Sequence, residues 1–293
     1  MKFEGSYVAL VTPFDREGRF DEDAYRDLIR RQIKGGTRGL VPCGSTGEAA
    51  TMLHEEYRRA IEVACDESRG EVPVIAGVGT NATWKAVESA REAESLGADA
   101  LLVLVPYYNK PTQEGIYQHF KAVARESRLP IIAYNIPGRT GVNMAPKTLA
   151  RLAEDCPTIC AVKEAAGSLD QVSEILTLTK TGFTVLSGDD SLTVPMMSVG
   201  AKGVISVVAN IAPKETQAVC AAALKGDYKK AGALHLRLFP LIKSLFIETN
   251  PIPVKAALAL MGRCRPEPRL PLTPLSAENR PALKKALKEF GLI

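Results

Sequence analysis

The chain has 293 residues, 46% of them hydrophobic and 24% charged, so it can bury a full core as one large domain or two smaller ones. Its 37 basic and 33 acidic residues give a net charge of +4 and are scattered, which argues against nucleic-acid and membrane-surface partners. No apolar run reaches the roughly 20 residues of a membrane span, and the segment before Asp15 lacks a signal-like apolar core. We therefore expect a cytoplasmic protein.

Neither a metal nor a dinucleotide cofactor is expected from the motifs. The six cysteines are spread thinly, so free thiols are the better interpretation, and the three histidines are far apart with no HExxH pattern. The run "GVGTNA" (77–82) lacks the third glycine and the later acidic residue of a dinucleotide-binding loop. The sequence thus predicts catalysis, if any, by side chains alone.

Short apolar runs rich in Val and Ile recur along the chain, each closed by Gly, Pro, Asn or Asp. This pattern is typical of parallel strands that are buried on both faces. Amphipathic helical stretches lie between them, such as "EEYRRAIEVACDES" and "QEGIYQHFKAVARES". The eight predicted strands cover residues 7–13, 39–44, 72–79, 100–106, 130–137, 159–165, 184–190 and 203–210.

Eight alternating strands and helices favour an α/β fold of the closed (β/α)8 TIM-barrel type, because closing the sheet leaves no edge strand. From about Lys214 the pattern becomes purely helical. Only the first of these helical stretches is needed as the eighth barrel helix. We therefore predict a barrel catalytic domain over 1–225 and a C-terminal helical extension over 226–293.

A lysine stands at the end of the sixth predicted strand, in "ICAVKEAAG" (159–167). Alternation puts Ile159, Ala161, Lys163 and Ala165 on one face of that strand. If this face lines the barrel interior, burial lowers the pKa of the Lys163 amine and frees it to form an imine with a carbonyl compound. The alternative is a structural lysine paired with an acid such as Glu164.

The fifth strand, in "IIAYNIPGRTG", adds two groups that suit such chemistry. Tyr134 should lie beside Lys163 and offer its hydroxyl for proton transfer, and Arg139 in the following loop could clamp a carboxylate. The alternatives are a core tyrosine and a solvated loop arginine. After the second strand, the small-residue turn from Gly44 to Gly47 presents N–H groups and hydroxyls suited to a carboxylate or keto acid, although a plain turn looks similar.

Taken together, the motifs resemble the dihydrodipicolinate synthase and N-acetylneuraminate lyase family of lysine-dependent pyruvate aldolases. The resemblance runs nearly end to end and is specific because the motifs keep the family's order and spacing. These motifs are "ALVTPF", "GSTGE", "PYYNKP", "YNIPGRTG", "AVKEAAG", "LSGDD", "GVISVVAN" and "NPIPVKAAL".

The resemblance, strongest to the synthase branch, implies condensation of pyruvate with L-aspartate 4-semialdehyde to 4-hydroxy-tetrahydrodipicolinate, in diaminopimelate and lysine biosynthesis. It implies catalytic roles for Lys163 as imine former, Tyr134 as proton shuttle, and Thr46 and Tyr108 as relay partners. The implied substrate-binding residues are Ser45, Thr46, Arg139, Gly188 and Ile205. The family usually has two threonines where this chain has Ser45-Thr46, and we expect activity to survive this change.

The resemblance also implies assembly and regulation. Tyr108 would reach into a neighbouring subunit's site, which requires a dimer and usually a homotetramer made of two dimers. The implied lysine-effector site is altered here, because a glutamate is replaced by a lysine and a histidine by a tyrosine; it consists of His54, Tyr57, Asn81, Lys85 and Tyr107. We expect weak or no feedback by L-lysine.

Two alternative functions stay open at this point. One is a pyruvate-dependent sugar-acid aldolase or lyase, acting on N-acetylneuraminate or a 2-keto-3-deoxy acid through the same Lys163 and Tyr134. Arg139 argues against it, because sialic acid lyases resembling this fold lack an arginine at the corresponding position. The other is a non-catalytic barrel that binds a keto acid, in which Lys163 would form no imine.

Overall fold

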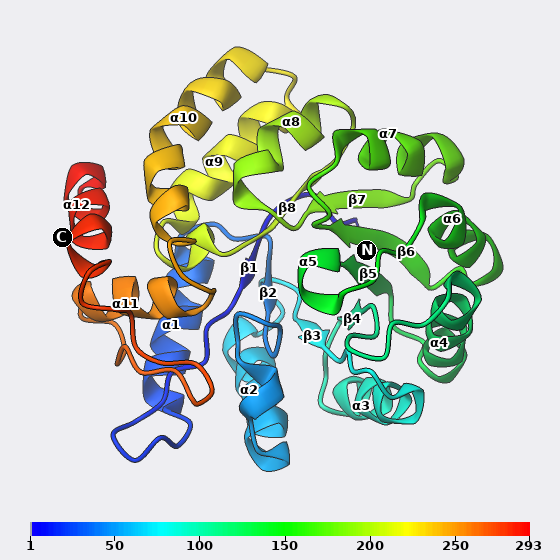
Figure 1. The fold of residues 1–293 in the computed structure, drawn as a ribbon, viewed down its shortest axis with the longest axis horizontal. Helices are drawn as coiled ribbons and strands as arrows, with labels where there is room; N and C mark the ends of the chain where they lie inside the picture. Colours follow the sequence, from blue (N-terminus) through cyan, green and yellow to red (C-terminus); the bar gives the residue numbers. More distant parts are fainter. Residues whose placement is uncertain (1) are drawn as a thin grey trace.

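Eight parallel strands form the centre of the computed structural model, which describes residues 2–293 (Figure 1). The hydrogen-bonded order is β2-β1-β8-β7-β6-β5-β4-β3, and a parallel bridge between Leu40 and Val74 joins the two ends of this order. The predicted (β/α)8 barrel is confirmed. The strands are β1 Gly5–Ala9, β2 Gly39–Val41, β3 Ile75–Gly77, β4 Ala100–Leu104, β5 Ile131–Asn135, β6 Ile159–Glu164, β7 Thr184–Ser187 and β8 Gly203–Ser206.

Helices alternate with the strands and surround them. Local capping helps to set their ends: the Asp21 side chain accepts a hydrogen bond from the Ala24 N–H and so begins the first helix. The helices of this outer ring are α1 Glu22–Lys34, α2 His54–Ser68, α3 Thr83–Ser95, α4 Gln113–Glu126, α6 Pro146–Asp155, α7 Leu169–Leu178, α8 Thr193–Ser198 and α9 Pro213–Leu224. Among residues 2–293, no helix combines the length and apolar character of a bilayer-spanning segment.

Short helical turns follow several strands on the side of the barrel where the strands end. They are η1 Ala49–Thr51 after β2, α5 Pro137–Thr140 after β5, η2 Asp190–Leu192 after β7 and η3 Val208–Asn210 after β8. Figure 1 shows α5 in the middle of the ring of helices rather than on its outside. These turns therefore surround the end of the barrel where catalytic groups sit in this fold.

Three further helices form the C-terminal extension, which lies against one side of the barrel (Figure 1). They are α10 Tyr228–Ser244, α11 Ile252–Leu260 and α12 Arg280–Phe290. The helical stretch that begins at about Lys214 is divided into α9 and α10. Gly226 has a φ of 77°, and the Asp227 side chain caps α10 by accepting from the Lys230 N–H. Our proposed division at 225/226 lies in this turn.

Two apolar layers result from the alternation of side chains along the strands. Ala161, Ile132 and Tyr134 belong to the interior cluster, whereas Val162 packs in the layer between strands and helices. The predicted face of β6 is thus correct except at Ile159, which packs in the outer layer. The register shifts there, since Ile131 pairs with Ile159 and Ile132 with Ala161, so the extra residue of a β-bulge reverses the alternation.

A buried ion pair connects the extension to the segment that follows β2. Lys255 of α11 is 0% exposed, and its Nζ lies 2.7 Å from Oε1 of the buried Glu48. The other carboxylate oxygen of Glu48 accepts the main-chain N–H of Arg269 at 2.8 Å. The Lys255 amine also lies 4.2 Å from the centroid of the Phe14 ring. Each charge is therefore compensated only by the other and by local polar or aromatic groups.

We predict that Lys255→Met lowers the free energy of unfolding by about 3–5 kcal/mol, because it leaves Glu48 as an unpaired buried charge. Urea unfolding followed by circular dichroism measures this change. Lys225→Met, at the exposed end of α9, is the matched control and should change stability by less than about 0.5 kcal/mol. Equal stability of the two variants would contradict the stabilising role of the pair.

Candidate active site

Lys163 lies near the end of β6 and points into the barrel interior. Its side chain is only 6% exposed, and it pairs in register with Tyr134 of β5. The amine lies 4.2 Å from the centroid of the Tyr134 ring. Burial lowers the pKa of Lys163 to about 7; Asp190 opposes this change and Arg139 adds to it. A large share of the amine is therefore neutral near neutral pH, which is the form that attacks carbonyl carbon.

The carboxylate next to Lys163 in sequence is engaged elsewhere. Glu164 accepts hydrogen bonds from the side chains of Asn135 and Gln171 and from the Ala166 N–H. Gln171 belongs to α7 of the outer ring, so the Glu164 carboxylate is held on the outer side of the sheet. Among residues 2–293, Lys163 and Glu164 form no ion pair. The expected structural alternative, in which these two side chains pair, is thus contradicted.

The charge that acts on Lys163 from inside the site is Asp190, which follows β7. Its Oδ2 accepts the N–H groups of Val207 and Val208 at 2.9 and 3.0 Å, at the start of η3. Asp190 is itself buried, and burial raises the pKa of its carboxyl, while hydrogen bonds from Ser206, Val208 and Val207 oppose this increase. The sequence interpretation assigned Asp190 no role, although it lies in the "LSGDD" motif.

Tyr134 supplies a hydroxyl at the end of β5. Its side chain is 6% exposed, and burial raises its pKa to about 12; the Arg139 charge and a side-chain hydrogen bond with Ser45 act in the opposite direction. The hydroxyl is therefore protonated at neutral pH, and the ring that carries it lies 4.2 Å from the Lys163 amine. This arrangement suits proton donation to, and recovery from, a reacting group on Lys163.

The turn after β2 brings Ser45 and Thr46 to the same end of the barrel. Gly47 packs closely there: a Cβ at this position would lie 3.1 Å from the Leu10 carbonyl oxygen, which explains a glycine in "GSTGE". Thr46 is buried, and its Oγ1 accepts a hydrogen bond from Nδ2 of Asn250 at 2.9 Å. The sequence analysis missed Asn250, although it begins the "NPIPVKAAL" motif.

Arg139 was expected in a loop but lies in the short helix α5, where Pro137 occupies the first position. Its Nη2 donates to the main-chain oxygen of Asn250 at 2.9 Å. The guanidinium is close enough to the buried site to lower the pKa values of both Lys163 and Tyr134. Its remaining N–H groups can receive an anionic group that enters from the solvent side.

Gly188 lies next to Lys163, and Ile205 faces the barrel interior. A Cβ on Gly188 would lie 3.2 Å from Cε of Lys163 and 2.7 Å from Cβ of Ala165, so a side chain here would crowd the amine. Ile205 of β8 belongs to the same interior cluster as Tyr134. Of the predicted site residues, the fold thus brings Lys163, Tyr134, Ser45, Thr46, Arg139, Gly188 and Ile205 to one end of the barrel.

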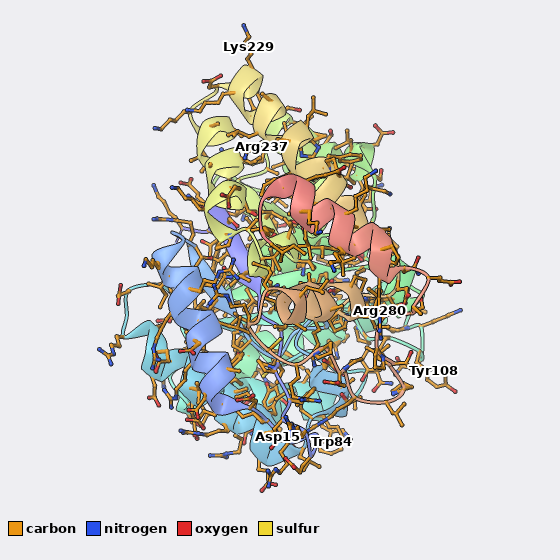
Figure 2. The ribbon with its side chains drawn as sticks, turned by 90° about the vertical axis from the view of Figure 1, so that its left-hand side faces the viewer. Asp15, Trp84, Tyr108, Lys229, Arg237 and Arg280 are labelled. Atoms are coloured by element: carbon orange, nitrogen blue, oxygen red, sulfur yellow. The ribbon has the colours of Figure 1, made fainter. Side chains whose placement is uncertain are left out.

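Tyr108 is not part of the buried site of its own chain. Its side chain is 87% exposed, and Figure 2 shows it at the edge of the molecule. It follows β4 with a φ of 72°, a conformation that is uncommon for a residue with a side chain. Its N–H donates to the Thr140 carbonyl oxygen at 3.3 Å, which ties this loop to α5.

The residues of the predicted effector site lie on the segments that follow β2, β3 and β4. His54 is exposed and contacts Glu92 at 3.1 Å, whereas the Tyr57 hydroxyl donates inward to the Gly77 carbonyl oxygen. Lys85 lies over the exposed ring of Trp84 at 5.3 Å from its centroid. Asn81 accepts a hydrogen bond from Asn109 through its main-chain oxygen, and Tyr107 is half-buried on the segment after β4.

Among residues 2–293, His, Cys, Asp and Glu side chains form no group of three that could hold a metal.

We predict that an amine-directed reagent labels Lys163 increasingly from about pH 6 to pH 8. Its pKa is lowered from 10.5 to about 7, so the neutral, reactive amine forms as pH rises through 7. Peptide mass mapping after brief labelling at a series of pH values measures the effect, and the exposed Lys225 serves as an internal control for the general pH dependence of the reagent. Identical pH profiles for the two lysines would contradict the lowered pKa.

Comparison with known proteins identifies relatives over the whole chain. The 4-hydroxy-tetrahydrodipicolinate synthase of Syntrophus aciditrophicus (strain SB) is 52% identical over 291 residues, which is 99% of each chain. A crystal structure of dihydrodipicolinate synthase from Aquifex aeolicus is 50% identical with a TM-score of 0.97 over 99% of each chain. The enzyme from Acinetobacter baumannii, described as chloride inhibited and complexed with pyruvate, is 44% identical with a TM-score of 0.97 over 99% of each chain.

These likenesses confirm the predicted fold and favour the synthase activity over the sugar-acid alternative. The family model described as "Dihydrodipicolinate synthetase family" matches residues 2–290. The chain belongs to the dihydrodipicolinate synthetase family.

Proposed function

We propose that the chain condenses pyruvate with L-aspartate 4-semialdehyde through an imine on Lys163 and releases 4-hydroxy-tetrahydrodipicolinate. One observation carries the proposal: a buried lysine amine with a pKa near 7 lies beside a buried tyrosine ring, at the end of the barrel where this fold places its chemistry. The name of the relative from Syntrophus aciditrophicus supports the choice of reaction. The product leads to diaminopimelate and lysine.

The first half of the reaction joins pyruvate to the enzyme. The neutral Lys163 amine attacks the keto carbon, and the carbinolamine loses water to give the imine. Tyr134 would donate and recover the protons of these steps. The hydroxyls and N–H groups of Ser45 and Thr46 would hold the pyruvate carboxylate. Loss of a proton from the pyruvate methyl group then gives the enamine, which is the carbon nucleophile.

The second half joins the two substrates. The enamine carbon attacks the aldehyde carbon of the semialdehyde, whose carboxylate would be bound by Arg139. The amino group of the semialdehyde then attacks the imine carbon, closes a six-membered ring and expels the Lys163 amine. The two substrates thus become one product and one water, with no external cofactor or metal, and the enzyme is regenerated.

The proposal includes assembly, because the proton relay from Tyr134 through Thr46 would be completed by Tyr108 of a neighbouring subunit. The exposure of Tyr108 supports this arrangement, as does that of Leu53 and Trp84 on the neighbouring segments. Exposed large apolar side chains of this kind suit an interface between copies. A homotetramer of two dimers and a cytoplasmic location remain predictions.

The direct test follows pyruvate consumption with L-aspartate 4-semialdehyde as acceptor. We predict that Arg139→Ala lowers kcat/KM for the semialdehyde roughly 100-fold, because it removes charged hydrogen bonds to the acceptor carboxylate. Arg128→Ala, an exposed arginine at the end of α4, is the control and should retain full activity. Equal activity of both variants would show that Arg139 does not bind the acceptor.

Sugar aldehydes separate the synthase from its alternatives. N-acetylmannosamine and glyceraldehyde should be poor acceptors beside the semialdehyde. Turnover with a sugar aldehyde alone would favour a sugar-acid aldolase. The absence of any turnover, together with the absence of a pyruvate imine, would favour the non-catalytic keto-acid-binding barrel.

We predict that L-lysine inhibits the enzyme weakly or not at all. Lys85 occupies the position at which regulated members of the family have a carboxylate, so an ammonium group would meet an ammonium group. Titration of the initial rate with L-lysine measures this, and Lys85→Glu is expected to increase sensitivity. Strong inhibition of the wild type at micromolar lysine would contradict the expectation.

A further inference from the structure

Asn250, a buried residue that lies two positions before α11, contacts the site from the C-terminal side of the chain. Its side-chain Nδ2 donates to Oγ1 of Thr46 at 2.9 Å, and its main-chain oxygen accepts from Nη2 of Arg139 at 2.9 Å. One residue outside the barrel therefore contacts both the hydroxyl of the proposed proton relay and the arginine of the proposed acceptor site.

The contact with Thr46 fixes the direction in which its hydroxyl works. A hydroxyl has one proton to donate and two lone pairs that can accept. Because Asn250 occupies one lone pair with an N–H donor, the Thr46 proton must point to another acceptor. The Thr46 proton is then available to another acceptor, such as a reacting group bound in the site, and it does not first have to break a bond to Asn250.

A second contact keeps Asn250 and Thr46 at this distance. Glu48, two residues after Thr46, is held in the left-handed region with a φ of 56°. Lys255, five residues after Asn250, contacts Glu48 at 2.7 Å. The two segments that form the Asn250–Thr46 hydrogen bond are thus joined a second time, by the buried ion pair between Lys255 and Glu48. Buried pairs of this kind are better explained by specific geometry than by stability alone.

We infer that Asn250 is a positioning residue, which orients the Thr46 hydroxyl through its side chain and Arg139 through its main chain, while the Lys255–Glu48 pair keeps it in register. The inference rests on the proposed function, because it assigns Thr46 and Arg139 their roles in that reaction. Through Asn250, the C-terminal extension would then contribute to catalysis by positioning groups of the barrel. The barrel alone would contain the reacting groups without their orientation.

Two substitutions of the Asn250 side chain test this inference, since both leave its main-chain oxygen available to Arg139. Asn250→Ala removes the donor and should lower kcat about 10- to 100-fold, whereas KM for the semialdehyde should change less than about threefold. Asn250→Asp keeps the shape but replaces the N–H donor by an acceptor. The Thr46 proton would then turn toward the carboxylate, so kcat should fall at least as far as in the alanine variant.

The controls separate positioning from folding. Asn279→Ala removes another asparagine of the extension, one that donates to Glu248 away from the site, and should leave kcat unchanged. Thermal unfolding and the fraction of chains that trap pyruvate on borohydride reduction are measured for every variant. The rate is then expressed per imine-forming site, and the solvent deuterium isotope effect on kcat should be larger in both Asn250 variants than in the wild type.

Two outcomes would overturn the inference. Wild-type kcat in Asn250→Asp would mean that Thr46 donates to Asn250 rather than accepts from it. Wild-type kcat per imine-forming site in Asn250→Ala, together with lower thermal stability, would assign Asn250 a structural role alone. Failure of the proposed function is recognised separately, because the unsubstituted enzyme would then neither trap pyruvate nor consume the semialdehyde.

Discussion

Removal of one amine from water is the constraint on which the rest of the site depends. Charging a buried lysine is costly. Around Lys163 the barrel interior offers the aromatic ring of Tyr134 and the charge of Asp190, which opposes the effect of burial without reversing it. The amine is therefore held near the midpoint of its titration at neutral pH. A close carboxylate would have raised the pKa and removed the nucleophile, which is why the engagement of Glu164 on the outer side of the sheet matters.

The barrel brings the other groups to this amine from strands that are distant in sequence. Parallel strands end at the same edge, so the turns after β2, β5, β7 and β8 meet there. The turn after β2 contributes hydroxyls and N–H groups. Strand β5 carries the phenol of Tyr134, and the turn after it carries the guanidinium of Arg139. Gly188 after β7 leaves room beside the amine, and Ile205 of β8 adds an apolar side chain. The extension then closes this edge through Asn250 and Lys255. Barrel and extension are thus one functional unit, although they are separate in sequence.

Much of this organisation was predictable from the sequence, because the barrel pattern and the position of Lys163 rest on local rules of alternation. Alternation with a period of two correctly predicts the interior face of β6 from Ala161 onward. The prediction fails at Ile159, because a β-bulge leaves no pattern in a run of apolar residues. The break between α9 and α10 was signalled by Gly226 and Asp227 but was hidden in a long helical pattern.

Contacts between distant segments could not be predicted in the same way. Asn250 and Thr46 are separated by 204 residues, and no periodicity relates them. The exposure of Tyr108 likewise follows from the path of the segment after β4, and the role proposed for it would depend on a second copy of the chain. Sequence reasoning therefore found the reacting groups more readily than the groups that orient them.

Reduction of the enzyme with borohydride in the presence of pyruvate, followed by peptide mass mapping, tests the central claim most directly. The account predicts one carboxyethyl group per chain, located on the peptide that contains Lys163, and none in Lys163→Ala. Trapping should increase as the pH is raised through 7. Pyruvate trapped on another lysine, or none trapped on the active enzyme, would contradict the assignment of Lys163 as the residue that forms the imine.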